Sequence, residues 1–322
     1  MNIDIKENLE LDSIWNSEIF QNQQQTIFLS KKFLDYHPPE RFNVLNLFIF
    51  LDNKLFLIIP CVKNSEELFS HTGTTYGGII QYFEESKEVY KKVLQELRHY
   101  LKMKNFKSIT FRLPPKIFIS QSINSFINSI DIFQELFTEE ETYVDLTRNN
   151  FIDLKQSGYR RNHIRDIKKI ESIESDLQIA KVKNEKELSE YYEILENNLK
   201  KHNVKPTHSK SELSWLLDNF KKQIWIDVLK FKEKIVSGIV IFKMNEEVLH
   251  YFYGSIDYNF KQIGAIKYLY WQTMKKAQKD NFKLINFGVD SKFGEEQNHS
   301  LRSFKLGFGG LHTHRRTVRL NV

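Results

Sequence analysis

The sequence predicts an α/β (α+β) protein built as two tandem halves, each a mixed and mostly antiparallel sheet flanked by helices. Two observations support this prediction: an internal repeat, and a succession of helical and strand-like segments that recurs in both halves. With 322 residues the chain is long enough for two ordinary domains. Its 41% hydrophobic content supplies apolar side chains for a core in each.

The repeat joins Lys104–Phe111 to Asp280–Phe287. Both segments share Asn-Phe-Lys followed by an isoleucine and a phenylalanine at matching positions, and each follows a helix-like segment and precedes a loop. We therefore expect a domain at 1–150 and a second one at 151–322.

In the second half, apolar runs of strand length alternate with segments of helical spacing. β-Branched and aromatic runs separated by the charged turns 232–234 and 245–247 predict an antiparallel meander. The expected order is a strand at 176–182, helices at 185–202 and 210–220, strands at 224–231, 235–244 and 248–255, a helix at 264–279, a strand at 284–289, a short helix at 298–306 and a strand at 313–322.

The first half shows a shorter version of the same order. The expected elements are a helix at 26–36, strands at 44–50, 55–62 and 68–75, a helix at 84–104, a strand at 108–112, a helix at 115–130 and a strand at 142–147.

Composition excludes several classes of protein. No run approaches the roughly 18 apolar residues of a membrane span, and the N-terminus lacks the pattern of a signal peptide, so we expect a cytoplasmic location. The single cysteine, Cys61, cannot form an internal disulfide and is expected to be a small buried hydrophobe. The net charge of +6 is a mild excess, concentrated at Tyr159–Lys169.

The element order resembles the GNAT acyltransferase fold, and two such halves in one chain resemble the Fem-type (FemAB-like) transferases. The matching motifs lie in order along the second half: Arg160-Arg161-Asn162, Tyr253-Gly254 with Asn259 before the helix at Gly264, Asn286-Phe287-Gly288, Phe304-Lys305 and Phe308-Gly309. The resemblance implies a degenerate first domain and a second domain that transfers an acyl or aminoacyl group from an activated carrier to an amine of a cell-envelope or nucleotide-linked sugar precursor.

Two departures from the family pattern bear on the donor. Lys261 stands where Arg or Gln is usual in the pyrophosphate loop, and Ile266 replaces a small residue, which counts against acetyl-CoA. The helical-hairpin arm of the enzymes that use aminoacyl-tRNA is missing, because 165–178 is too short to hold it. Acyl-CoA is therefore expected as the donor ahead of aminoacyl-tRNA, and nucleic acid is expected as a partner only in that role.

Acyl transfer needs a place for the phosphates of the carrier, and a helix N-terminus offers N–H donors and a positive dipole. The residues predicted to form it are Lys261, Gln262, Gly264 and Ala265. The alternative is a glycine that only turns the chain into a helix.

Three residues are candidates for the chemistry. Lys305 matches the late lysine of the family and would neutralise a phosphate or an oxyanion, unless it is a solvated helix lysine. Asp290 follows a buried strand at the end where α/β sheets carry functional loops, or else caps a turn. His250 and Tyr253 are expected on opposite faces of one strand; of the two we prefer Tyr253, although a packing role fits either.

Arg160, Arg161 and His163 are expected to bind an anionic group such as a nucleotide diphosphate, the alternative being a solvated charged face. His312 and His314 lack a third ligand nearby, so no metal is predicted. Two other functions stay open: a non-catalytic binding or scaffold protein, suggested by the imperfect phosphate loop, and a nucleic-acid-binding protein using the basic segment, which lacks stacking aromatic motifs.

Overall fold

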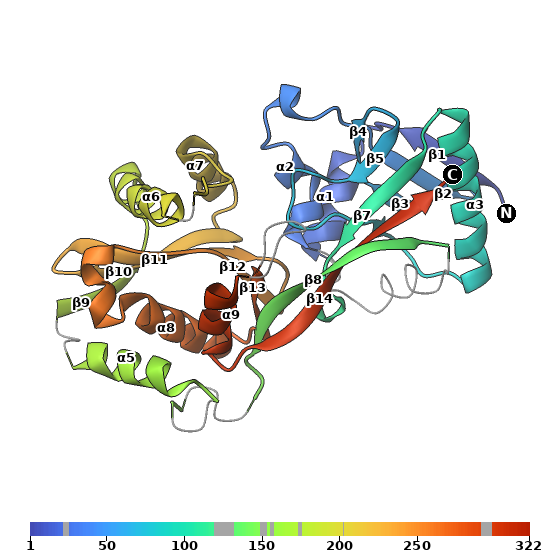
Figure 1. The fold of residues 1–322 in the computed structure, drawn as a ribbon. Coiled ribbons are helices and arrows are strands. Elements are labelled where there is room, and N and C mark those ends of the chain that lie inside the picture. Colours follow the sequence, from blue (N-terminus) through green and yellow to red (C-terminus); the bar gives the residue numbers. More distant parts are fainter. Residues whose placement is uncertain are drawn as a thin grey trace. The chain divides into compact units, whose positions relative to one another are not determined.

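The computed structural model describes residues 1–21, 26–118, 132–148, 153–154, 158–172, 176–201, 203–290 and 298–322 (Figure 1). They form two compact units: unit 1 comprises Met1–Glu140 with Thr313–Val322, and unit 2 comprises Glu141–His312. The chain thus enters unit 2 earlier than the expected boundary at 150/151, and its last strand belongs mainly to unit 1. Strands β8 (Gln134–Asp145) and β14 (Leu311–Asn321) each contribute residues to both units.

Unit 1 contains an antiparallel sheet of four strands, β1 (Ile3–Glu7), β2 (Leu47–Leu51), β3 (Lys54–Ile59) and β6 (Ile80–Gln81). Strand β7 (Ser108–Leu113) pairs in parallel with β5 (Glu67–Ser70), which pairs with β4 (Val62–Asn64), and β7 also pairs with β14. Between β1 and β2 the chain forms the helices α1 (Asp12–Gln21) and α2 (Lys31–Leu34) and the short 3₁₀ helices η1 (Ile27–Leu29) and η2 (Pro39–Arg41).

Helix α3 (Lys87–Met103) supplies much of the core of unit 1. Ser86 caps it by accepting a hydrogen bond from the backbone of Val89. Its apolar residues recur at helical spacing and are buried against strand residues such as Leu57 and Ile109. The buried residues of α3 are Tyr90, Val93, Leu94, Leu97 and Leu101.

Unit 2 confirms the predicted order of elements. After α5 (Arg161–Glu171) come β9 (Leu177–Lys181), α6 (Glu185–Lys200), α7 (Lys210–Asn219), β10 (Ile224–Phe231), β11 (Lys234–Lys243), β12 (Val248–Ile256), η5 (Tyr258–Ile263), α8 (Ala265–Lys279), β13 (Leu284–Val289) and α9 (His299–Leu306). The strands lie in the order β8, β13, β12, β11, β10, β9, and only β12 and β13 pair in parallel. Helices α6 and α7 cover one face of this sheet, and α5 and α8 lie on the other (Figure 1).

The structure corrects several expectations for unit 1. The helix expected at 26–36 is divided into η1 and α2, because Ser30 is extended and its side chain caps the second turn. Pro60 separates β3 from β4 within the strand expected at 55–62. Strand β8 begins before the expected 142, and β1 was not predicted. Of the helix expected at 115–130, only the short η3 (Lys116–Phe118) lies within the described residues.

Candidate active site

Strands β12 and β13 pair through only three residues and then separate. The pairs are Val248 with Leu284, Leu249 with Ile285 and His250 with Asn286. Beyond them β12 continues to Ile256 and β13 to Val289, and we call Tyr251–Ile256 and Phe287–Val289 the separated strand ends. Because β12 is paired here only by β11, its other edge offers backbone donors and acceptors.

A β-bulge distorts β12 at the start of its separated end. Val240 of β11 lies opposite Tyr253, while the adjacent Ile241 lies opposite Tyr251, so Phe252 is the extra residue. The bulge places His250 and Tyr253 on the same face, since they oppose Phe242 and Val240, which share a face of β11. The expectation that they lie on opposite faces is therefore wrong, because it assumed uninterrupted alternation.

An aromatic cluster lies against the separated strand ends. The ring of Tyr270 on α8 stacks on Phe308 with centroids 5.3 Å apart and also contacts Phe287. A Cβ added to Gly254 would lie 2.2 Å from the Tyr270 hydroxyl oxygen. The glycine of Tyr253-Gly254 therefore allows the helix to approach β12 closely.

The structure brings Lys305 and Asp290 together at the carboxyl end of β13. Lys305 Nζ lies 2.7 Å from Asp290 Oδ1 and donates to the carbonyl oxygens of Gly288 at 3.0 Å and Val289 at 2.8 Å. The Asp290 side chain is fully buried, and its Oδ2 accepts a hydrogen bond from Thr142 Oγ1 at 3.1 Å. Lys305 is thus not a solvated helix lysine.

Burial and the neighbouring charge shift the pKa of Lys305 in opposite directions. Burial lowers its pKa from the ordinary value, and the nearby charge of Asp290 opposes that shift. An ammonium has three N–H donors, and the three oxygen acceptors around Nζ match that number. An oxyanion bound at Lys305 would therefore have to replace one of them.

The predicted phosphate cradle lies where η5 leads into α8. Gly264 has φ 78°, a left-handed conformation that glycine adopts without strain, and no side chain caps the helix that follows. Lys261 is exposed and its ammonium lies 5.6 Å from the centre of the Tyr258 ring. Ala265 is buried and can contribute only backbone. The side chain of Gln262 lies outside the described residues.

Helix α5 adds an ion pair at the start of α8 that the sequence analysis missed. Asp166 Oδ2 lies 2.6 Å from Lys267 Nζ, and a Cβ on Gly264 would lie 2.9 Å from the Asp166 carbonyl oxygen. This pairing lowers the pKa of Asp166 against the opposing effect of burial. The charge of Lys267 is thereby compensated, which leaves Lys261 as the cation for a ligand. No sequence signal links residues 166 and 267.

The hydroxyl of Tyr253 is engaged by the loop before α7. It accepts hydrogen bonds from the backbone N–H of Thr207 at 2.7 Å and of His208 at 3.3 Å, and it lies 3.3 Å from His208 Nδ1. Burial raises the pKa of Tyr253, and these hydrogen bonds oppose the shift. In this arrangement Tyr253 fixes a loop to β12.

The three residues predicted to bind an anion separate into two groups. Arg161 is exposed on α5, and Arg160 donates to Ser303 Oγ on α9. His163 instead points into the core, and its ring nitrogens lie 3.0 Å from Asn162 Oδ1 and from the Phe304 carbonyl oxygen. Burial lowers the pKa of His163 to about 4, with a smaller contribution from Lys267, so the ring is neutral at pH 7. His163 therefore packs α5 against α9 and does not serve as the predicted anion contact.

In unit 1 the chain itself occupies the corresponding end of the sheet. The repeat aligns β7 with β13, but β5 and β7 stay paired from Glu67 and Ser108 to Ser70 and Phe111. Just beyond, the Gly77 N–H donates to the Arg112 carbonyl oxygen at 2.7 Å. A Cβ on Gly77 would lie 1.2 Å from the Ser70 carbonyl oxygen, so glycine is required. In unit 1 the backbone at Gly77 therefore occupies the position that corresponds to the separation of β12 and β13 in unit 2.

The described residues lack two features, a cluster of metal ligands and a membrane-spanning helix. Among them, no group of three or more His, Cys, Asp or Glu side chains is arranged to hold a metal ion. Within the same part of the chain, no helix has the length and apolar character needed to cross a membrane.

Comparison with known proteins bears on the fold of the chain. Residues 157–297 match the family model described as an acetyltransferase (GNAT) domain. Among solved structures, FemX has a TM-score of 0.71 at 10% identity, covering 98% of this chain and 97% of that chain. A tandem GNAT protein from the clavulanic acid biosynthesis pathway has a TM-score of 0.55 at 7% identity, covering 99% and 98%. No curated protein matches the sequence.

A third similar structure is the C-terminal domain of a putative lysylphosphatidylglycerol synthetase from Agrobacterium fabrum. Its TM-score is 0.62 at 11% identity, and the match covers 96% of this chain and 91% of that chain. The chain therefore has a tandem GNAT/Fem-type fold, as its element order predicted. Within its second unit, residues 157–297 match the family model of the acetyltransferase (GNAT) domain, a domain of acyltransferases.

Proposed function

We propose that unit 2 transfers an acyl or aminoacyl group from an activated carrier to an amine of a cell-envelope or nucleotide-linked sugar precursor, in the cytoplasm. The observation that carries this proposal is the separation of β12 from β13 after His250 and Asn286, next to the buried pair of Lys305 and Asp290. The separated strand ends provide an unpaired backbone edge for an extended carrier, and the pair provides charge beside it.

Acyl-CoA is the proposed donor ahead of aminoacyl-tRNA. Three features of the start of α8 support a diphosphate there: the left-handed Gly264, a first turn without a side-chain cap, and the exposed Lys261. The Asp166 carboxylate nearby is compensated by Lys267 and so does not repel an anion strongly. On the acceptor side, the exposed Arg161 suits a phosphate of a nucleotide-linked precursor.

The chemistry would proceed by attack of the neutral amine on the acyl carbonyl carbon. A C–N bond forms and the carbonyl oxygen gains negative charge. The tetrahedral intermediate then breaks its C–S bond and expels the carrier thiolate, and the proton lost by the amine restores the Tyr253 hydroxyl after that hydroxyl has protonated the thiolate. We assign Lys305 to the developing oxyanion, with Asp290 and Thr142 positioning its ammonium. Tyr253 would protonate the leaving thiolate after its hydroxyl releases the 207–208 backbone.

A donor screen tests this function. The purified chain would be mixed with acetyl-CoA, longer acyl-CoAs or charged tRNA and a panel of amines, and followed by thermal shift and mass spectrometry. The proposal expects stabilisation by one donor class and an acylated amine of matching mass. Lys305→Ala should abolish product formation while Lys283→Ala, a change to an exposed lysine before β13, should not. Absence of both stabilisation and product with every donor would contradict the proposal.

A second candidate function is a non-catalytic binding or scaffold protein. It is favoured by the full engagement of the Lys305 ammonium and the Tyr253 hydroxyl within the protein. This candidate predicts stabilisation by a carrier without any product. Under the transferase function, unchanged product formation in Tyr253→Phe, which keeps the ring, would remove Tyr253 from the chemistry.

A further inference from the structure

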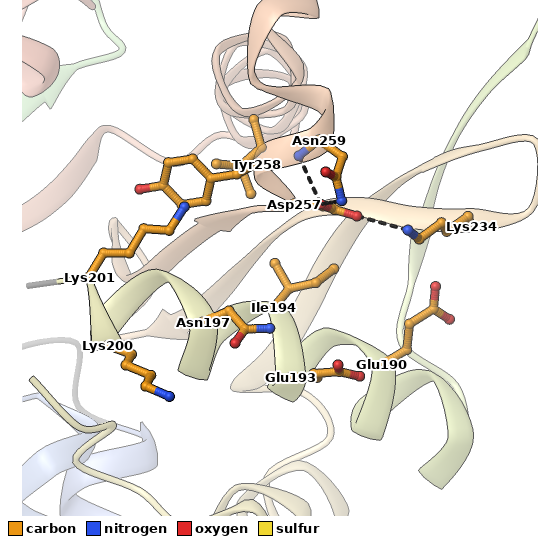
Figure 2. A pocket seen from close by; sticks show the side chains of 11 residues that line it. Glu190, Glu193, Ile194, Asn197, Lys200, Lys201, Lys234, Asp257, Tyr258 and Asn259 are labelled. Atoms are coloured by element: carbon orange, nitrogen blue, oxygen red, sulfur yellow. Dashed lines mark hydrogen bonds and ion pairs between the residues drawn. The ribbon is translucent and has the colours of Figure 1, made fainter.

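A pocket of about 590 Å³ lies in unit 2 between α6 and the chain that leaves β12 (Figure 2). That volume lies within the range of small-molecule sites. Its lining residues come from one face of α6, from the first residue of β11 and from the turn into η5. They are Glu190, Glu193, Ile194, Asn197, Lys200, Lys201, Lys234, Ile256, Asp257, Tyr258 and Asn259.

The lining side chains from α6 and the residue after it change from acidic at one end of the pocket to basic at the other. Figure 2 shows Glu190 and Glu193 toward one end, and Lys200 and Lys201 with Tyr258 toward the other. Glu193 and Lys200 are seven positions apart on α6, which corresponds to about 10 Å along the axis of the helix. Like charges three or four positions apart on a helix repel each other, so Glu190 and Glu193 favour a cationic group beside them.

Some of these charges are already used by the protein. Lys234 Nζ lies 2.9 Å from Asp257 Oδ2, and Glu190 Oε1 accepts a hydrogen bond from the backbone of Ile235 at 2.8 Å. The ammonium of Lys201 lies over the Tyr258 ring. Within the described part of the chain, neither Glu193 nor Lys200 forms an ion pair or a side-chain hydrogen bond. One acid and one base therefore remain available, at opposite ends.

The lining between the two ends is partly apolar and partly amide. Ile194 and Ile256 are almost fully buried and form an apolar base. The side chain of Asn197 is exposed on α6, and that of Asn259 faces the pocket from the turn into η5. A ligand with a flexible, mainly apolar backbone can contact the isoleucines, and amide groups in it can pair with the asparagines.

We propose that this pocket binds a zwitterion whose ammonium and carboxylate lie about 10 Å apart, the ammonium at Glu190 and Glu193 and the carboxylate at Lys200 and Lys201. The acidic end also holds Lys234, which pairs with Asp257 and whose pKa is raised further by the charges of Glu190 and Glu193. Only a ligand that carries both an ammonium and a carboxylate can contact the available Glu193 and Lys200 together. The pocket shares no lining residue with Lys305 or Asp290, and the proposal does not depend on acyl transfer.

Two kinds of molecule have this charge spacing. An extended tripeptide with free termini spans about 10 Å, and a linear ω-amino acid such as 8-aminooctanoate is of similar length. The probes are trialanine, 8-aminooctanoate, N-acetyl-trialanine and trialanine amide, each titrated into the full chain without any acyl donor and followed by isothermal titration calorimetry. Binding of trialanine alone would assign the site to peptides, through Asn197 and Asn259; binding of both zwitterions would show that charge spacing is sufficient.

The expected result is saturable binding of at least one zwitterion, weakened about tenfold or more when either of its charges is removed by acetylation or amidation. Glu193→Gln and Lys200→Gln should weaken binding similarly. The matched controls are Glu196→Gln and Lys186→Gln, exposed residues of α6 outside the pocket, which should leave the affinity unchanged. The proposal is overturned if neither zwitterion binds up to about 10 mM, if the blocked peptides bind equally well, or if the pocket and control variants behave alike.

Discussion

We predict that Lys305 and Asp290 contribute to the free energy of unfolding as a pair, so that the effect of changing one depends on the presence of the other. Lys305→Met removes the ammonium and leaves the fully buried Asp290 carboxylate without its counter-charge, and the carbonyls of Gly288 and Val289 lose a donor. Breaking a buried pair by removing one partner costs about 3–5 kcal/mol. Asp290→Asn leaves the ammonium with neutral acceptors and the charge of Glu141, and should cost an amount in the lower part of that range.

The double variant Lys305→Met/Asp290→Asn removes both charges. Its cost should therefore be less than the sum of the single costs by about 2 kcal/mol or more. Urea unfolding followed by circular dichroism measures each free energy of unfolding. Lys283→Met, which breaks the exposed pair with Glu247, is the control and should cost no more than about 1 kcal/mol. Additive single costs, or a cost for Lys305→Met no larger than that of the control, would show that the two side chains do not form a coupled pair.

Three further predictions concern other parts of the chain. Gly77→Ala should destabilise the protein by about 3 kcal/mol or more, against about 1 kcal/mol for Gly158→Ala, which meets no neighbouring atom, as read from urea midpoints. The pKa of His163 is about 4 in the folded protein and about 6.5 in the unfolded chain, so between these pH values His163 is protonated mainly in the unfolded state. The free energy of unfolding should therefore fall as the pH drops through this range, by up to about 3 kcal/mol. His163→Gln should reduce that slope in pH-dependent denaturation; an equal slope would show that His163 is not its source. Tyr253→Phe should cost about 1–2 kcal/mol, because the backbone N–H of Thr207 loses its acceptor; an unchanged unfolding midpoint would contradict this role.

The meander of unit 2 could be predicted from the sequence because strong local signals bound each strand. β-Branched runs end at charged turns, and in the structure Lys232 and Glu233 of one such turn adopt positive φ. The strands expected at 224–231 and 284–289 have the observed bounds. The sequence indicates only a basic segment where α5 lies, because its many charged residues conceal the spacing of the buried positions His163, Ile167 and Ile170.

Individual residues of the candidate site could be predicted from the sequence, but their arrangement in space could not. Lys305 and Asp290 were each singled out, but their pairing depends on how α9 packs against the end of β13, which no local pattern encodes. The bulge at Phe252 reversed the expected parity of His250 and Tyr253, because one extra residue shifts every later side chain to the other face. The ion pair of Asp166 with Lys267 joins distant helices and leaves no sequence signal.

Under the proposed function, the separated strand ends and the start of α8 hold the activated carrier. The most direct measurement is a crystal structure of the chain with a non-hydrolysable acyl-CoA analogue. We expect diphosphate oxygens within about 3 Å of the N–H groups that follow Gly264, with Lys261 beside them and the acyl end between β12 and β13. An analogue bound elsewhere, with the start of α8 empty while the protein transfers acyl groups, would contradict it.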